Sequence, residues 1–162
     1  MSLLYVDDIR GKTAATDVDL SNVTNLKMPA GAVIQVVQTV GSTGRQTYSS
    51  ASFFDIVTVS ITPKFSTSKI LVSVHTSITR TNSAYANVQI TKENSQILSC
   101  DTQAAYTADH TVENSVGSVS GQILDSPSTT SATTYKLQAR ISGSGYLYVD
   151  GQPVITAQEI AG

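Results

Sequence analysis

Hydrophobic residues recur at every second position along most of this chain, which is the period of a β-strand with one buried face. The clearest case places four hydrophobic side chains on one face of residues 134–142, at Tyr135, Leu137, Ala139 and Ile141. The same alternation is found in residues 32–40, 53–61, 70–78, 86–90, 116–124, 145–149 and 154–160. Helical periodicity is almost absent. The pattern predicts an all-β chain of about eight strands, folded as an antiparallel β-sandwich or jelly roll.

Turn signals separate these segments where strands should end. Pro63 follows one run and presets φ for a turn. Asp150-Gly151 is the strongest hairpin signal, because both central positions of its turn favour positive φ. We therefore expect residues 145–149 and 154–160 to form a hairpin around it. Residues 101–115 show no clear period and predict a long loop, a feature that is often functional.

Residues 1–28 differ from the rest of the chain. They hold few alternating hydrophobic residues, and their charged residues include Asp7, Asp8, Arg10, Lys12, Asp17 and Asp19. We interpret them as an extended N-terminal arm and residues 29–162 as a β-sandwich head domain. The first residues lack the basic and apolar pattern of a secretion signal, so we expect synthesis in a cytoplasm.

Charge excludes several classes of partner. Only 14% of the residues are charged and the net charge is −2, well below the usual quarter of charged residues. The basic residues are scattered, so we expect no nucleic-acid partner. One cysteine, Cys100, excludes an intrachain disulfide. No apolar run approaches the roughly 20 residues of a membrane helix, so we expect no membrane partner.

No catalytic or phosphate-binding motif is present at its required spacing, and we expect neither an enzyme nor a cofactor. A metal site is one alternative, because His110 lies near carboxylates in the 101–115 segment and His75 lies on a strand. Acid–base chemistry on glycans is another. Its candidate carboxylate pairs are Asp101 with Asp109 and Asp55 with Asp125. A solvated or interfacial role fits these residues better, and we predict no metal site.

Tyrosine is the chain's main aromatic residue and is common at interfaces. Tyr146 and Tyr148 fall on the same face of one predicted strand. They belong either to an ordinary sandwich core or to a subunit or receptor contact. The candidate contact residues are Tyr106, His110, Tyr146 and Tyr148.

Several segments resemble fibre-type proteins of marine bacteriophages. There, an arm with a Val-Asp-x-Ile stretch, here residues 6–9, precedes Pro-Ala-Gly-x-Val-x-Gln-Val, here residues 29–36. The similar segments are residues 4–14, 28–38, 61–72, 124–138 and 154–162. The resemblance implies a virion structural protein, made in the host cytoplasm, with a trimeric jelly-roll head that is distantly similar to tumour-necrosis-factor-like trimers.

The chain departs from the usual tail fibre because it has no repetitive shaft between arm and head. A capsid decoration protein, of cement or head-fibre type, fits this layout at least as well. The expected partners are two further copies of the chain and another virion protein, either the major capsid protein or a tail or fibre adaptor. The expected anchoring residues are Leu4, Tyr5, Val6, Ile9 and Arg10. The alternative is a tail-fibre tip that recognises a host surface glycan or protein.

Overall fold

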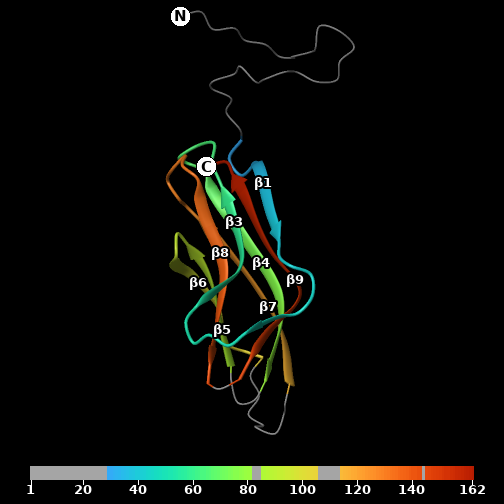
Figure 1. Ribbon diagram of the computed structural model, residues 1–162. Coiled ribbons are helices and arrows are strands. Elements are labelled where there is room, and N and C mark those ends of the chain that lie inside the picture. Colours follow the sequence, from blue (N-terminus) through green and yellow to red (C-terminus); the bar gives the residue numbers. More distant parts are fainter. Residues whose placement is uncertain (1–28, 82–84, 106–113, 144) are drawn as a thin grey trace, which may run out of the picture.

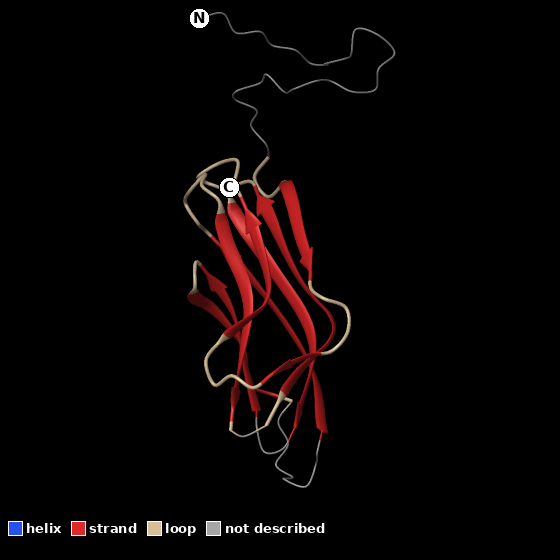
Figure 2. Cartoon of the chain, in the orientation of Figure 1, coloured by secondary structure: helices blue, strands red, loops and turns tan. Residues whose placement is uncertain are grey.

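The computed structural model describes residues 29–81, 85–105, 114–143 and 145–162 (Figure 1). These residues form nine strands and no helix, arranged as two antiparallel sheets that face each other (Figure 2). The first sheet has the order β1 (Val33–Val40), β9 (Leu147–Ile160), β4 (Lys69–Thr81) and β7 (Asn114–Asp125), with β2 (Gln46–Tyr48) also paired to β9. The second has the order β3 (Phe54–Ile61), β8 (Thr133–Ser142), β5 (Tyr85–Lys92) and β6 (Ser95–Ala104).

The strand pairing is that of a jelly roll. Apart from the short β2, the first strand pairs with the last, the second with the second-to-last, and so on inward. The pairs are β1 with β9, β3 with β8, β4 with β7, and β5 with β6, all antiparallel. This pairing is that of one long antiparallel hairpin that is folded so that successive strand pairs fall in alternate sheets. The predicted all-β sandwich is confirmed.

The core is built from the alternating positions that the sequence indicated. The hydrophobic side chains of β8 from Tyr135 to Ile141 are buried, as are Ile70, Val72 and Ile78 of β4. The phase is lost at the start of β3, where the register shifts between Asp55 and Val57. Phe53 is consequently more than a third exposed, although it was expected on the buried face.

The hairpin predicted at Asp150-Gly151 is wrong, because both residues lie within the continuous strand β9. β4 is long enough to pair with β9 on both sides of them. The step from His75 to Ser77 in β4 is matched by the longer step from Val154 back to Asp150. Gly151 has φ +72°. This positive φ belongs to a bulge within the continuous strand β9, and not to a turn that reverses the chain.

The long loop predicted for residues 101–115 is shorter in the structure. β6 continues to Ala104 and β7 begins at Asn114. β6 is an edge strand that pairs with β5 through three register shifts, and such irregular pairing removes the alternation of a regular strand. The pattern of Asp101 and its neighbours therefore did not predict the strand that they form.

A buried carboxylate fastens one end of the sandwich. Glu159 of β9 is fully buried, and its Oε1 accepts hydrogen bonds from the backbone N–H of Lys64 at 2.7 Å, that of Phe65 at 3.3 Å, and the Ser68 hydroxyl at 2.7 Å. Its Oε2 accepts one from Gln35 of β1. Burial alone would raise the pKa of Glu159, but these hydrogen bonds outweigh it and hold the pKa below its ordinary value.

Candidate association surface

The middle of the first sheet's outer surface carries no charged side chain, whereas Lys69 and Asp150 lie in the rows at its two ends. Three rows of outward side chains cross its four strands at paired positions, and we call these twelve residues the uncharged face. The rows are Val36–Gln158–Leu71–Leu124, Gln38–Thr156–Ser73–Gln122 and Val40–Val154–His75–Ser120. None of the twelve is Asp, Glu, Lys or Arg. Depletion of charge is what distinguishes the centre of a protein interface from the rest of a surface.

Large hydrophobic side chains are exposed at both edges of this sheet. Val33, Val36 and Val40 line the β1 edge, with exposed fractions from 46 to 56%. At the β7 edge, Leu124 is 50% exposed and Val116 is 71% exposed. These five are the majority of the eight large hydrophobic residues exposed in the described part of the chain. Exposed hydrophobic residues gathered on one sheet are typical of an association surface.

The outer surface of the second sheet is different, because its polar side chains are paired with one another. Lys136 forms an ion pair with Asp55 at 2.8 Å, and Gln138 donates a second hydrogen bond to the same carboxylate. Burial alone would raise the pKa of Asp55, but these partners hold it below its ordinary value. Arg140 donates to Asn87 on the neighbouring strand. A surface of satisfied charges of this kind is stable in water, so the two faces of the sandwich are not equivalent.

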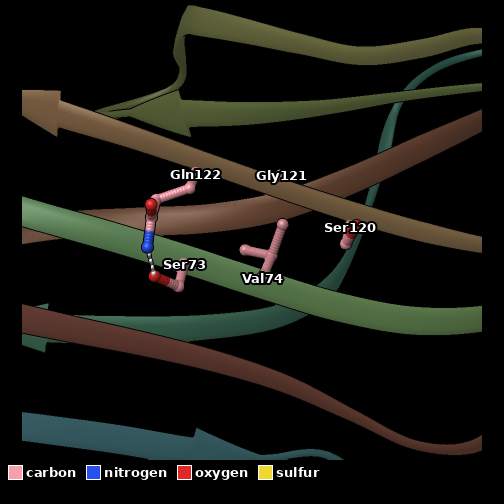
Figure 3. A pocket seen from close by; sticks show the side chains of 5 residues that line it. All are labelled: Ser73, Val74, Ser120, Gly121 and Gln122. Atoms are coloured by element: carbon pink, nitrogen blue, oxygen red, sulfur yellow. Dashed lines mark hydrogen bonds between the residues drawn. The ribbon is translucent and has the colours of Figure 1, made fainter.

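The centre of the uncharged face is shallow and lined by small residues. A hollow of about 410 Å³ lies between β4 and β7 and is lined by Ser73, Val74, Ser120, Gly121 and Gln122 (Figure 3). Gln122 donates a hydrogen bond to Ser73 across its mouth. A Cβ at Gly121 would lie only 2.7 Å from the sulfur of Cys100 in β6, so glycine is needed there for close packing of the two sheets. On the outer side, the small side chains of Ser73 and Ser120 allow another surface to approach closely.

The predicted contact residues Tyr146 and Tyr148 lie at the other end of the same sheet, where Tyr148 of β9 pairs with Thr47 of β2 and Thr79 of β4. Their rings are nearly parallel, with centres 6.4 Å apart, and the Arg45 guanidinium sits 4.6 Å from the centre of the Tyr148 ring. Arg45 is held by an ion pair with Asp150 at 2.7 Å. Tyr146 is half exposed and Tyr148 partly buried, so neither belongs to the core. Their contact with a partner stays a prediction.

The structure places Asp55 and Asp125, a pair considered for acid–base chemistry, with different partners. Asp125 accepts from Lys92 and from the Tyr135 hydroxyl, whereas Asp55 is bound to Lys136 and Gln138 on the outside of the second sheet. The described residues contain no group of three or more His, Cys, Asp or Glu side chains that could hold a metal. No helix suited to crossing a membrane occurs among them either.

Several predicted residues fall outside the described part of the chain. They are the anchoring residues Leu4, Tyr5, Val6, Ile9 and Arg10, together with Tyr106, Asp109 and His110. His75 is described, and it is exposed on the uncharged face as the strand pattern predicted.

Sequence reasoning missed the exposed hydrophobic residues at the sheet edges. Val36 and Val40 occur in a run where both faces of β1 carry valine, and Leu124 sits at an outward position of β7. The sequence did contain a signal for these residues, because β1 is apolar on both faces. In a two-sheet sandwich the core covers only one face of each sheet, so the other apolar face is exposed.

The fold places the chain in the class of double-sheet jelly rolls. No protein-family model matches it, and no curated protein is similar to it in sequence. Among solved structures, a subviral particle of infectious bursal disease virus VP2 is similar over 91% of this chain, with 11% identity and a TM-score of 0.48. The structure of the Gx strain of that virus is similar over 92%, with 12% identity and a TM-score of 0.45.

Those viral chains are longer than this one, which covers 37% and 41% of them respectively. At such low identity and TM-score the likeness gives no information about function.

Proposed function

We propose that the chain is a structural protein of a bacteriophage virion, a trimeric capsid decoration protein whose head associates through the uncharged face and whose arm, residues 1–28, anchors it to the particle. The absence of charge from that face, beside exposed hydrophobic residues at both edges, is the observation that carries the proposal. The resemblance of residues 4–14 and 28–38 to phage fibre proteins supplies the virion setting.

The occupant of the uncharged face is a second copy of the chain. A partner of opposite charge has nothing to pair with there, whereas an identical uncharged surface is complementary in polarity. Apolar positions at two opposite edges of one sheet favour a contact between different patches, in which the β1 edge of one copy packs over the uncharged face of the next and reaches its β7 edge. A heterologous contact of this kind that closes on itself forms a ring, and the trimer that the resemblance to phage fibre proteins implies is the smallest such ring.

Trimerisation would make the arm an effective anchor. Three linked arms raise one another's effective concentration, so weak individual contacts hold the particle tightly. An extended arm gains its affinity by adding a strand to the edge of a neighbouring sheet rather than by burying a core. Deletion of residues 1–28 is therefore expected to leave a folded trimer that no longer enters particles. Incorporation of the truncated protein would show that the anchor is elsewhere.

Substitution on the uncharged face tests the association directly. Leu124→Lys adds a charge at the β7 edge, and we expect it to convert the trimer to monomers in size-exclusion chromatography with light scattering. Ser60→Lys, at an exposed position on the outer side of β3, is the matched control and should remain trimeric. Loss of the trimer in both variants, or in neither, would contradict the assignment of the face.

A second candidate function is that of a tail-fibre tip that binds a host surface glycan. It is favoured by one observation, the stack of Arg45, the partly buried Tyr148 and the half-exposed Tyr146. Aromatic and guanidinium groups at one site are suited to stacking and to hydrogen bonding with a ligand. A glycan array with the purified protein tests it, and Tyr146→Ala should abolish any signal that is found.

A further inference from the structure

His75 is the one histidine among the twelve residues of the uncharged face. It is exposed in the middle of β4, paired to Ser120 of β7 on one side and Val154 of β9 on the other. The next strand, β1, places Val40 in the same row. His75 is the only residue among the twelve that can take up a charge near neutral pH. All the others are aliphatic, hydroxyl or amide side chains.

No charged side chain on the surrounding strands is available to compensate a charge on His75. Along β4 itself its outward neighbours are Ser73 and Ser77, and on β7 they are Ser118 and Gln122. On β9 the outward residue beyond Val154 is Thr156 in one direction and Asp150 in the other. The Asp150 carboxylate is already used by Arg45 and by the Thr79 hydroxyl. On β1 the nearest outward side chains are valine and Gln38.

We propose that His75 makes association through the uncharged face dependent on pH, so that the trimer forms when the imidazole is neutral and dissociates when it is protonated. The inference rests on the proposed function, because it requires that a second copy cover this face. Covering removes water from the imidazole, and burying an unpaired charge is strongly unfavourable. Three symmetry-related copies add like charges to one small assembly, and these repel one another.

The sign and size of the effect follow from this exclusion. Association selects the neutral form, so it is complete at high pH and weakens as the pH falls. For a free imidazole, whose pKa is about 6.5, the protonated form is about ten times more abundant than the neutral form at pH 5.5. A trimer that admits only neutral histidine then loses about tenfold in association per subunit, or about a thousandfold for three. The midpoint concentration of a monomer–trimer equilibrium varies as the square root of its dissociation constant, so this midpoint should rise about thirtyfold between pH 7.5 and pH 5.5.

Sedimentation velocity of the full chain at pH 7.5 and pH 5.5 tests the inference, with circular dichroism at both values to confirm that the chain stays folded. We expect the wild type to be trimeric at pH 7.5 and monomeric at pH 5.5 at the same concentration. His75→Gln keeps a polar side chain without the titration and should be trimeric at both. His75→Lys carries a charge at both and should be monomeric at both.

The outcomes separate the two levels of the argument. A wild type that is trimeric at both pH values overturns the role of His75 and leaves the trimer standing, whereas one that is monomeric at both overturns the proposed function itself. Dissociation of His75→Gln at pH 5.5 would show that another group titrates. Dissociation of the wild type by a chelator at pH 7.5 would show that the histidines hold a metal, which also overturns the proton-based account.

Discussion

Glu159 offers a sharp test of how this sandwich is held together, because it is a fully buried carboxylate with four hydrogen-bond donors and no cationic partner among them. Replacing it by alanine leaves the part-buried backbone N–H of Lys64 and the buried Ser68 hydroxyl without their acceptor. Each such orphaned group costs about 1–3 kcal/mol. Because the groups share one site their costs do not add fully, and we expect Glu159→Ala to lose about 3–5 kcal/mol of unfolding free energy.

Glu159→Gln is the informative companion, because it keeps the volume and one oxygen acceptor. Hydrogen bonds to an ionised acceptor are roughly twice as strong as those between neutral groups, so we expect a smaller loss of about 1–2 kcal/mol. Gln35 sharpens the test. Its side-chain N–H groups donate to Glu159 and to the Thr62 carbonyl, so Gln35→Ala in the Glu159→Gln background should cost less than it does in the wild type.

The pH dependence follows from the lowered pKa of Glu159. Because its folded-state pKa lies below the unfolded value, the carboxylate contributes stability that is fully present above the unfolded pKa and is lost as the pH falls through the folded pKa. Urea unfolding should therefore show a flat free energy between about pH 6 and 8 and a decline below about pH 4.5 that is shallower in Glu159→Gln. Equal stability and equal pH slopes for the wild type and Glu159→Gln would refute the reasoning.

Two further predictions concern local features of the fold. Gly151→Val should destabilise the protein by about 1–2 kcal/mol in urea unfolding, because the +72° φ of Gly151 strains a β-branched residue although no atom blocks a Cβ there; an unchanged midpoint would place the bulge elsewhere. Burial and the Asp101 charge raise the pKa of Cys100 to about 11, so its reaction with a thiol reagent at pH 8 should be many times slower than that of a free thiol and should accelerate on unfolding; equal rates would show that Cys100 is accessible.

The alternation of hydrophobic residues was enough to predict the fold class and most strands, because every central strand buries one face. The alternate hydrophobic positions from Ile70 to Ile78 and from Tyr135 to Ile141 are buried in the core, as the sequence predicted. The prediction failed where local geometry departs from strict alternation, as at the bulge of Gly151 and along the irregular edge strand that contains Asp101. The dipeptide Asp150-Gly151 fits both a hairpin turn and a bulge. The strand continues through it because the neighbouring strand β4 is long enough to pair with β9 on both sides.

The candidate surface was only partly predictable. The polar face of the β4 strand was recognised, including His75, but the rows that cross β1, β9, β4 and β7 depend on which strands become neighbours. That choice is made by the winding of the whole chain, which pairs residues as distant as Val36 and Gln158. The pairing of Lys136 with Asp55, which makes the opposite face self-sufficient, is equally a product of topology.

The central claim is that the β1 edge of one copy contacts the β7 edge of the next, and a short bismaleimide cross-linker tests it. In a Cys100→Ser background, the account predicts that Val36→Cys with Leu124→Cys gives covalent trimers of the 17.1 kDa chain, whereas neither single variant is cross-linked. Dimers from a single variant, or dimers without trimers from the double variant, would indicate a two-fold contact instead. The absence of any cross-link in the double variant would contradict the account.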